Sequence, residues 1–177
     1  MTDDLKIQIN DRRVRAWIDA AVQTVGNTHD VLDTIGNVVA NEVRQSFIRG
    51  ESPYHEPWAP LKLRAGQPLR DTGRLMNSIT YQVWAGYVEV GTNVCYAPVH
   101  QFGATIKARP GQPGRNRCGR RKGVPFLVFQ GADRKPIFAR QVTIPARPFL
   151  PDTRGFPATM RRKVITALSD MMGGGGA

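Results

Sequence analysis

Apolar residues recur three and four positions apart in the first third of the chain, and this spacing predicts helices. One amphipathic helix is expected over residues 12–25. A longer helix is expected over residues 28–49, with Thr28 as its cap and with Gly50 and Pro53 ending it. Neither helix carries acids, histidines or cysteines in a metal-ligand pattern, so we expect their apolar faces to pack into the core.

Apolar and polar residues alternate further along the chain, and this alternation predicts strands. Residues 81–83 and 87–90 are expected to form two strands that turn at Ala85-Gly86. A second pair is expected over residues 124–130 and 136–144, joined by a turn of hairpin length. Shorter strands are expected at residues 5–9 and 104–108.

The strand expected at residues 124–130 is apolar on both sides. Phe126 and Val128 share one face, and Leu127 and Phe129 share the other. Two apolar faces predict that the strand is covered on both sides, by a helix and by a neighbouring subunit.

Proline and glycine divide the rest of the chain. They predict a loop over residues 50–69, which the large ring of Trp58 anchors onto the core. Pro145 and Pro148 are expected to end a strand and to hold the segment that follows in an extended form. A last helix is expected from Pro157 to about Met172, with an apolar stripe made by Met160, Val164, Leu168 and Met171 or Met172.

These elements predict an α+β fold in one domain over residues 1–172. An antiparallel or mixed β-sheet is packed by two N-terminal helices and a C-terminal helix. The chain has 177 residues, of which 41% are hydrophobic, which suits one domain with a real core. A long basic loop is inserted at residues 107–123, and the glycine-rich residues 173–177 are expected to be disordered.

The charge of the chain changes this picture, because its formal value is +11. A basic balance of this size predicts attraction to nucleic acid, to acidic protein surfaces or to membranes. From Val90 through Ala132 there is no Asp or Glu. The basic loop holds seven positive charges that repel one another and therefore call for a negative partner: Lys107, Arg109, Arg115, Arg117, Arg120, Arg121 and Lys122.

Cysteine and histidine offer little chemistry. Cys95 and Cys118 do not make a disulfide framework, and a reducing compartment is the simplest expectation. A zinc site would need His100 and a further ligand, and a Cys95–His100 nucleophile and base lacks a supporting motif. We expect Cys95 to be a small buried residue and His100 to pack or hydrogen-bond within residues 96–103.

Other signs of a reactive site are equally sparse. His55 beside Glu56 is weak evidence for acid–base or metal chemistry, and the glycines of the basic loop do not make a phosphate-binding loop. We therefore expect no catalytic residue, no metal ligand and no cofactor. No apolar run approaches the roughly 20 residues that a membrane span needs, and the acidic start of the chain is not typical of a signal peptide.

Glycines and apolar residues organise the stretch from Leu69 to Gly103. Asp71 or Thr72 can cap a short helix, on which Leu75 and Ile79 share one face. The glycines are expected to set the corners of this block. We find no catalytic grouping in it and interpret it as architecture.

Seven short motifs in and around this stretch also carry a resemblance. They are residues 57–61 (PWAPL), 69–75 (LRDTGRL), 78–79 (SI), 90–93 (VGTN), 96–97 (YA), 100–103 (HQFG) and 144–150 (IPARPFL). In this order and spacing they resemble the virion-morphogenesis, or tail-completion, family of Mu-like and related tailed phages, over about residues 30 to 170. The resemblance implies a small α+β protein at the head–tail junction or the tail end, working as a ring.

The resemblance also implies a function and a set of assembly residues. We expect a structural virion protein of the tail or neck, assembled in the host cytoplasm, that completes or terminates the tail as a homo-oligomeric, hexameric ring. Its implied partners are further copies of itself and neighbouring tail-tube and head-connector proteins, and no membrane. The motif residues given this role are Thr72, Gly73, Leu75, Gly91, Tyr96, His100, Gln101, Phe102, Gly103, Arg147, Pro148 and Phe149.

Two expectations about this ring are specific. The basic loop either lines the channel and touches passing DNA without reading its sequence, or docks on acidic surfaces of an adjacent ring. We favour docking, because a channel that gripped DNA would hinder its exit. Replacing Phe149 with alanine is expected to leave a soluble subunit that joins particles poorly.

Two other functions stay open from the residues alone. The charge supports a stand-alone protein that binds nucleic acid without sequence preference, although no recognition helix, aromatic stacking ladder or zinc module is present. An enzyme such as a nuclease or hydrolase is the third hypothesis, and its weakness is the missing site.

Overall fold

The computed structural model describes residues 5–6, 12–62, 65–108, 126–130, 135–152 and 154–173. Its helices are α1 (Arg12–Val25), α2 (Thr28–Arg49), α3 (Arg74–Asn77), α4 (Ala97–Phe102) and α5 (Ala158–Gly173). Its strands are β1 (Leu5–Lys6), β2 (Thr80–Trp84), β3 (Tyr87–Thr92), β4 (Ala104–Lys107), β5 (Leu127–Gln130), β6 (Pro136–Ala139) and β7 (Gln141–Ile144). This mixture of helices and antiparallel strands confirms the expected α+β class.

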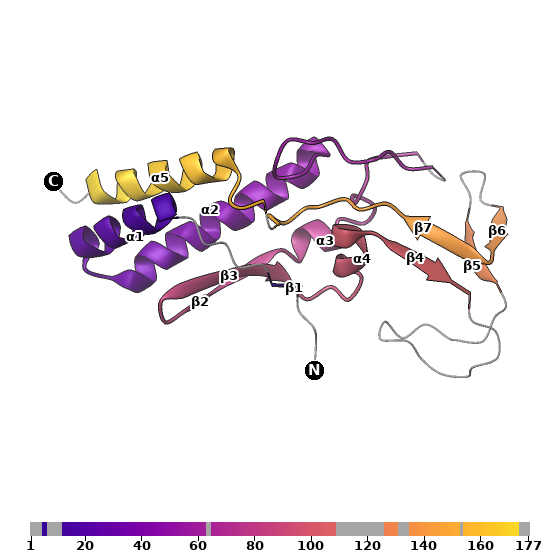
Figure 1. The fold of residues 1–177 in the computed structure, drawn as a ribbon, viewed down its shortest axis with the longest axis horizontal. Coiled ribbons are helices and arrows are strands. Elements are labelled where there is room, and N and C mark those ends of the chain that lie inside the picture. The colour runs from indigo at the N-terminus through magenta and orange to yellow at the C-terminus, as the bar shows by residue number, and fades with distance from the viewer. Residues whose placement is uncertain are drawn as a thin grey trace.

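Helices α1, α2 and α5 pack together, and α2 also lies on a three-stranded antiparallel sheet of order β1-β3-β2 (Figure 1). The helix approaches the sheet closely at Gly36. A Cβ atom at Gly36 would lie 2.3 Å from Cδ2 of Tyr81 and 2.8 Å from Cγ2 of Val88. Glycine therefore lets the longest helix lie flat on the hairpin of β2 and β3.

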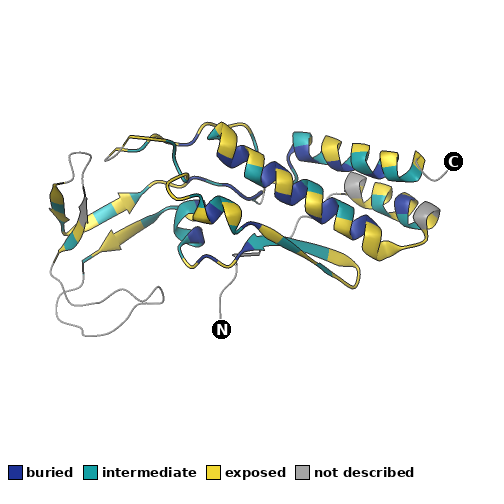
Figure 2. Cartoon of the chain, turned by 180° about the vertical axis from the view of Figure 1, so that it is seen from behind, coloured by how far each residue is buried: buried dark blue, intermediate teal, exposed yellow. Residues whose placement is uncertain are grey.

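The core is centred on Phe47 of α2, which is fully buried. Its ring lies 5.4 Å from the ring of Trp58, edge on, and 5.4 Å from the ring of Phe149. The expected anchoring of the loop by Trp58 is thus confirmed. Buried residues follow the inner sides of α2 and α5 (Figure 2), where the stripe of Met160, Val164 and Leu168 confirms the predicted face of the last helix.

Two antiparallel ribbons, β4–β7 and β5–β6, extend away from the helices (Figure 1), and we call them together the arm. One continuous strand was expected over residues 136–144, and this prediction is wrong. A bend at Arg140 interrupts the strand, so that β6 pairs with β5 whereas β7 pairs with β4. The carbonyl of Arg140 accepts a hydrogen bond from the Ala108 N–H at 2.8 Å, which extends the β4–β7 ribbon by one pair of residues.

The arm leaves apolar side chains in solvent. Val128 and Phe138 face each other across the β5–β6 ribbon and are 56% and 64% exposed, and Phe126 is exposed beside them. Within the described part of this chain the Phe126–Val128 face is exposed, so its expected cover by a neighbouring subunit stays a prediction. The ribbon extends beyond the helical body, which accounts for the exposure (Figure 1).

Helix ends differ from prediction in detail. The cap of α2 is Asn27 and not Thr28, because Asn27 is extended and its side chain accepts from the His29 N–H at 3.0 Å. Gly50 ends α2 in the left-handed conformation, as expected. Gly73, rather than Asp71 or Thr72, is the cap of α3, and the Thr72 hydroxyl accepts from the Arg74 N–H at 3.4 Å.

Some predictions lie outside the described residues. These are residues 7–9 of the first strand, residues 109–125 with most of the basic loop, the turn at 131–134 and the tail at 174–177. Among the helices that the structure describes, none combines the length and apolar character needed to cross a membrane.

Candidate functional site

The structure joins three of the motifs into one buried unit, which we call the clasp: the loop at 57–60, helix α4 and the segment at 145–150. Arg147 links all three. The residue is 5% exposed, and its guanidinium donates from Nε to the carbonyl of Ala59 at 2.8 Å and from Nη2 to that of Pro60 at 3.2 Å. Its backbone N–H donates to the carbonyl of His100 at 2.7 Å. Burial lowers the pKa of Arg147 from its ordinary value.

Gln101 of α4 supplies the second link of the clasp. Its side-chain oxygen accepts from the N–H groups of Phe149 and Leu150 at 3.0 and 3.1 Å, and its Nε2 donates to the Leu150 carbonyl at 3.0 Å. The indole N–H of Trp58 donates to the Pro148 carbonyl at 2.8 Å. The extended segment after β7 thus obtains from side chains the hydrogen bonds that a neighbouring strand would otherwise supply.

Gly103 connects the clasp to the arm. Its φ is 72°, and a Cβ there would lie 2.8 Å from the Ala146 nitrogen and 3.0 Å from the Ile144 oxygen. A side chain at this position therefore meets both backbone strain and backbone atoms. The close approach sets β4 and β7 side by side at the point where they leave the body.

His100 sits inside the clasp but lacks the environment of a catalytic base. Its ring meets Tyr96 edge on at 5.7 Å, which confirms the expected packing within residues 96–103. Its buried Nδ1 finds no hydrogen-bond partner among the described residues. Burial, followed by the nearby charge of Arg147, lowers the pKa of His100, so the ring favours its neutral form.

Cys95 does not match its prediction. It is exposed rather than buried, because it lies in the turn before α4, and it is disulfide-bonded rather than reduced. A disulfide sulfur offers neither a thiolate nucleophile nor a zinc ligand. The other cysteine, Cys118, lies outside the described residues.

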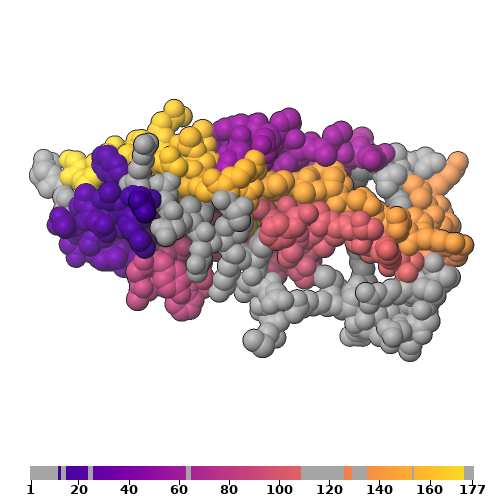
Figure 3. Space-filling view, in the orientation of Figure 1, coloured from indigo at the N-terminus to yellow at the C-terminus, as the bar shows by residue number. Residues whose placement is uncertain are grey.

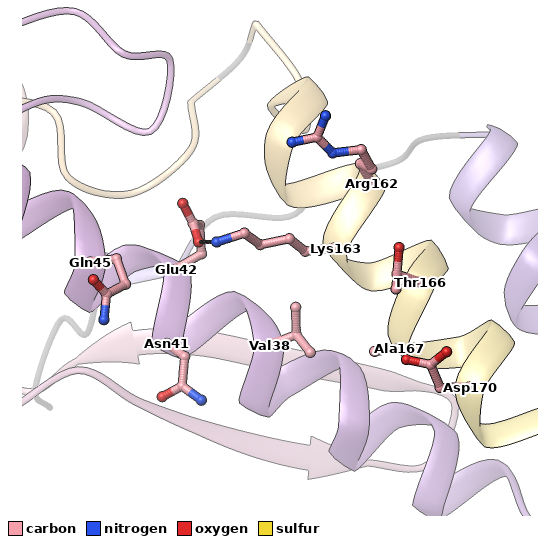
Figure 4. Close-up of a pocket in the computed structure, with 9 residues that line it drawn as sticks. All are labelled: Val38, Asn41, Glu42, Gln45, Arg162, Lys163, Thr166, Ala167 and Asp170. Carbon is pink, nitrogen blue, oxygen red and sulfur yellow. Dashed lines mark hydrogen bonds and ion pairs between the residues drawn. The ribbon is translucent and has the colours of Figure 1, made fainter. Parts of the chain in front are cut away.

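A shallow groove of about 360 Å³ runs between α2 and α5 (Figure 4). At its edge the Glu42 carboxylate, 4% exposed, binds Lys163 of α5 and, at 2.8 Å, Arg49. Burial alone would raise the pKa of Glu42, but the hydrogen bonds and charges of Lys163 and Arg49 outweigh it and hold the pKa below its ordinary value. We interpret these contacts as a link between two helices, which sequence reasoning missed.

His55 has a polar neighbourhood that its sequence position did not reveal. Its Nδ1 lies 2.7 Å from Glu51, four residues earlier, and its Nε2 lies 3.3 Å from the hydroxyl of Thr159. Glu56, the sequence neighbour considered with His55 as a candidate site, instead forms an ion pair with Arg154 at 2.7 Å.

The contacts of His55 with Glu51 and Thr159 connect the loop at residues 50–69 to the start of α5. Glu51 also forms an ion pair with Arg49 at 2.5 Å. None of these side chains lines the groove between α2 and α5. Burial would raise the pKa of Glu51, but its hydrogen bonds to His55 and Arg49 lower it. Among the described residues, no group of three or more His, Cys, Asp or Glu side chains is arranged to hold a metal ion.

Comparison with known proteins decides the family. The model of the phage virion morphogenesis family matches residues 9–172, nearly the whole chain. The chain belongs to the phage virion morphogenesis family. It is also 32% identical over 134 residues to a "Mu-like prophage FluMu G protein 2" of Haemophilus influenzae, covering 75% of this chain and 90% of that relative. No solved structure matches it.

Membership of the phage virion morphogenesis family confirms the resemblance read from the seven motifs. It gives the protein a role in building the phage particle, and the family is a structural one rather than an enzyme family.

The geometry shows what the motifs of this family member do within one subunit. Leu75, Gln101, Arg147 and Phe149 are buried, whereas Thr72 and Phe102 are exposed. Six further motif residues lie at intermediate depth: Gly73, Gly91, Tyr96, His100, Gly103 and Pro148. Four of the twelve residues assigned to assembly are therefore buried within this chain, and Phe102 is the large apolar one that reaches the surface. The role of the twelve in assembly stays a prediction.

The basic loop is described only at its first residue. Lys107 ends β4 and is exposed on the arm. Arg109, Arg115, Arg117, Arg120, Arg121 and Lys122 lie outside the described residues. The role of the loop stays a prediction.

Proposed function

We propose that this protein completes or terminates the phage tail at the head–tail junction, as a homo-oligomeric, hexameric ring in the tail or neck of the virion. Neighbouring tail-tube and head-connector proteins are its proposed partners. The family supports a structural role in the particle, and the resemblance of the motifs supports this place in it. No covalent chemistry is assigned to the protein.

One structural observation carries the proposal, namely the exposed apolar face of the β5–β6 ribbon. Val128 and Phe138 pair across the ribbon and stay in solvent within this chain. A two-stranded ribbon is marginally stable in water by itself, and contiguous exposed apolar surface marks a contact with another protein. An arm of this kind suits a subunit whose function is to join others, because the partner covers what the subunit leaves open.

Deletion of the gene from its phage or prophage tests the proposed function. We expect electron micrographs to show heads and tails that fail to join, or tails of irregular length, with infectivity restored by the wild-type gene. A reconstruction of the complete particle should place the protein as a ring at the head-proximal end of the tail. Normal yields of infectious particles from the deletion strain would contradict the proposal.

The net charge of +11 favours a second candidate, a stand-alone protein that binds DNA without sequence preference. Titration of purified protein onto a duplex at several salt concentrations separates the two. Sub-micromolar affinity at physiological salt, with a steep loss as salt rises, would favour the second candidate. Weak binding beside normal incorporation into particles favours the virion role.

A further inference from the structure

Opposite charges are segregated along this chain. Residues 16–43 contain no Lys or Arg but hold Asp19, Asp30, Asp33 and Glu42. Residues 90–132 contain no Asp or Glu. The fold turns this separation in sequence into a separation in space, because the first segment forms most of α1 and most of α2, whereas β4 and β5 belong to the arm at the other end of the molecule (Figure 1).

The acidic surface, which we call the helical end, is built from three elements. The Thr34 hydroxyl of α2 donates to the Met171 sulfur of α5 at 3.8 Å, and Asp33 accepts from the Tyr81 hydroxyl of β2 at 3.0 Å. The turn from α1 to α2, the end of α5 and the β2–β3 hairpin therefore form one surface (Figure 3). Asp19, Asp30, Asp33 and Asp170 are exposed on these helices.

The helical end also offers apolar surface. Trp84 and Tyr87 pair across the tip of the β2–β3 hairpin, with their rings stacked at 6.3 Å and both side chains exposed. Stacked, exposed aromatic residues beside carboxylates resemble the centre and rim of a protein–protein contact.

The arm presents the opposite charge with a matching apolar face. Lys107, Lys135 and Arg140 are exposed on it. Phe126, Val128 and Phe138 are exposed on the β5–β6 ribbon of the same arm. The arm thus combines an apolar face with cations, and the helical end combines an aromatic pair with carboxylates.

We infer that the arm of one copy docks on the helical end of the next copy, with the cations of the arm against the carboxylates of the helical end. This inference rests on the proposed ring. Two different surfaces that lie at opposite ends of one subunit make a head-to-tail contact, which is the kind of contact that closes into a ring. Charge orients the two copies, and burial of Val128, Phe138 and the Trp84–Tyr87 pair holds them together.

A second copy fits the arm better than DNA does. Contacts to DNA are dominated by phosphate, which offers no apolar surface to Val128 or Phe138. The helical end supplies both the negative charge and the apolar surface, and it is present at the same concentration as the arm because it belongs to the same chain.

Two charge-reversed variants test the inference. An arm variant carries Lys107→Glu and Arg140→Glu, and a helical-end variant carries Asp19→Lys and Asp170→Lys. All four positions are exposed, so the fold should be retained. In sedimentation velocity each variant alone should associate at least roughly tenfold more weakly than wild type, because like charges then meet at every contact. An equimolar mixture should assemble, since each altered surface then meets an opposite charge.

A matched control separates local from net charge. The variant Arg70→Glu with Arg74→Glu has the same net charge as the arm variant but alters exposed positions before and at the start of α3, outside both surfaces, and it should assemble like wild type. A third variant, Val128→Ser with Phe138→Ser, should weaken assembly also at high salt. Assembly of either charge variant alone at wild-type strength, a monomeric wild type, or a mixture that stays monomeric would overturn the inference.

The particle distinguishes failure of this contact from failure of the proposed function. If the arm variant enters phage particles as readily as wild type, the ring uses other surfaces and the inference falls while the virion role stands. If wild-type protein is absent from particles, the proposed function itself falls.

Discussion

The side chain of Gln101 pairs with the backbone of Leu150 through two hydrogen bonds, much as one strand pairs with another. Its oxygen accepts from the Leu150 N–H at 3.1 Å, and its Nε2 donates to the Leu150 carbonyl at 3.0 Å. A single residue of a six-residue helix thereby fixes the segment that leads from the arm into the core.

Gln101→Ala should therefore destabilise the protein strongly. The substitution leaves the buried N–H groups of Phe149 and Leu150 and the Leu150 carbonyl without partners. At about 1–3 kcal/mol for each such group, we expect the free energy of unfolding in urea to fall by about 3 kcal/mol or more. Gln82→Ala, at an exposed position of β2, is the control and should change it by less than about 0.5 kcal/mol.

Phe149 and Phe102 form a matched pair that separates folding from assembly. Phe149 is fully buried, so Phe149→Ala should cost about 3–5 kcal/mol of stability, instead of leaving the soluble subunit expected from sequence. Phe102 is 64% exposed, so Phe102→Ala should keep wild-type stability and lower incorporation into particles. Equal loss of stability in both variants would contradict this division.

Gly36→Ala should destabilise the protein although alanine favours helices by about 1 kcal/mol over glycine. The new methyl group would sit 2.3 Å from the Tyr81 ring, and neither α2 nor the ring can yield without disturbing the sheet. We expect a loss of about 1–3 kcal/mol by urea unfolding. Asn37→Ala, on the exposed side of the same helix, should be neutral or slightly stabilising, and a stabilised Gly36→Ala protein would refute the close contact.

His100 should make stability depend on pH. Burial and the charge of Arg147 lower its pKa in the folded state, whereas in the unfolded chain it titrates near 6.5. As pH falls below about 6.5, the unfolded chain takes up a proton that the folded chain does not, so the free energy of unfolding decreases. His100→Gln should lose this part of the slope when urea midpoints are compared from pH 7.5 downward. Parallel curves for the two proteins would contradict the assignment.

Regular, local patterns in the sequence predicted the fold best. The ends of α1 and α2 follow from helical spacing and flanking glycines, and the β2–β3 hairpin follows from alternation around Gly86. Helix α4 was not predicted. The contacts that hold it in place are not local, because Gln101 binds residues that lie 48 and 49 positions further along the chain. The break at Arg140 was missed for a similar reason, since the choice between β4 and β5 as a partner is not local.

The candidate site shows the same division. The motifs drew attention to Trp58, Gln101 and Arg147, but nothing local to them shows that they meet, because the bonds of Arg147 span 88 and 87 residues. The sequence revealed only the basic half of the charge separation, as the stretch over residues 90–132 that has no Asp or Glu. The acidic surface could not be predicted from the sequence, because it depends on the contacts that bring α2, α5 and the β2–β3 hairpin together.

The clasp has a practical consequence for watching this protein at work. Strand β4 begins and strand β7 ends next to the clasp, where the Trp58 indole is bound to the Pro148 carbonyl. We therefore expect a displacement of the arm to change the surroundings of the buried Trp58, whereas Trp17 and Trp84 are exposed and should emit at longer wavelengths. We expect Trp58 to emit at the shorter wavelengths typical of a buried indole, so that its emission follows engagement of the arm without any added label.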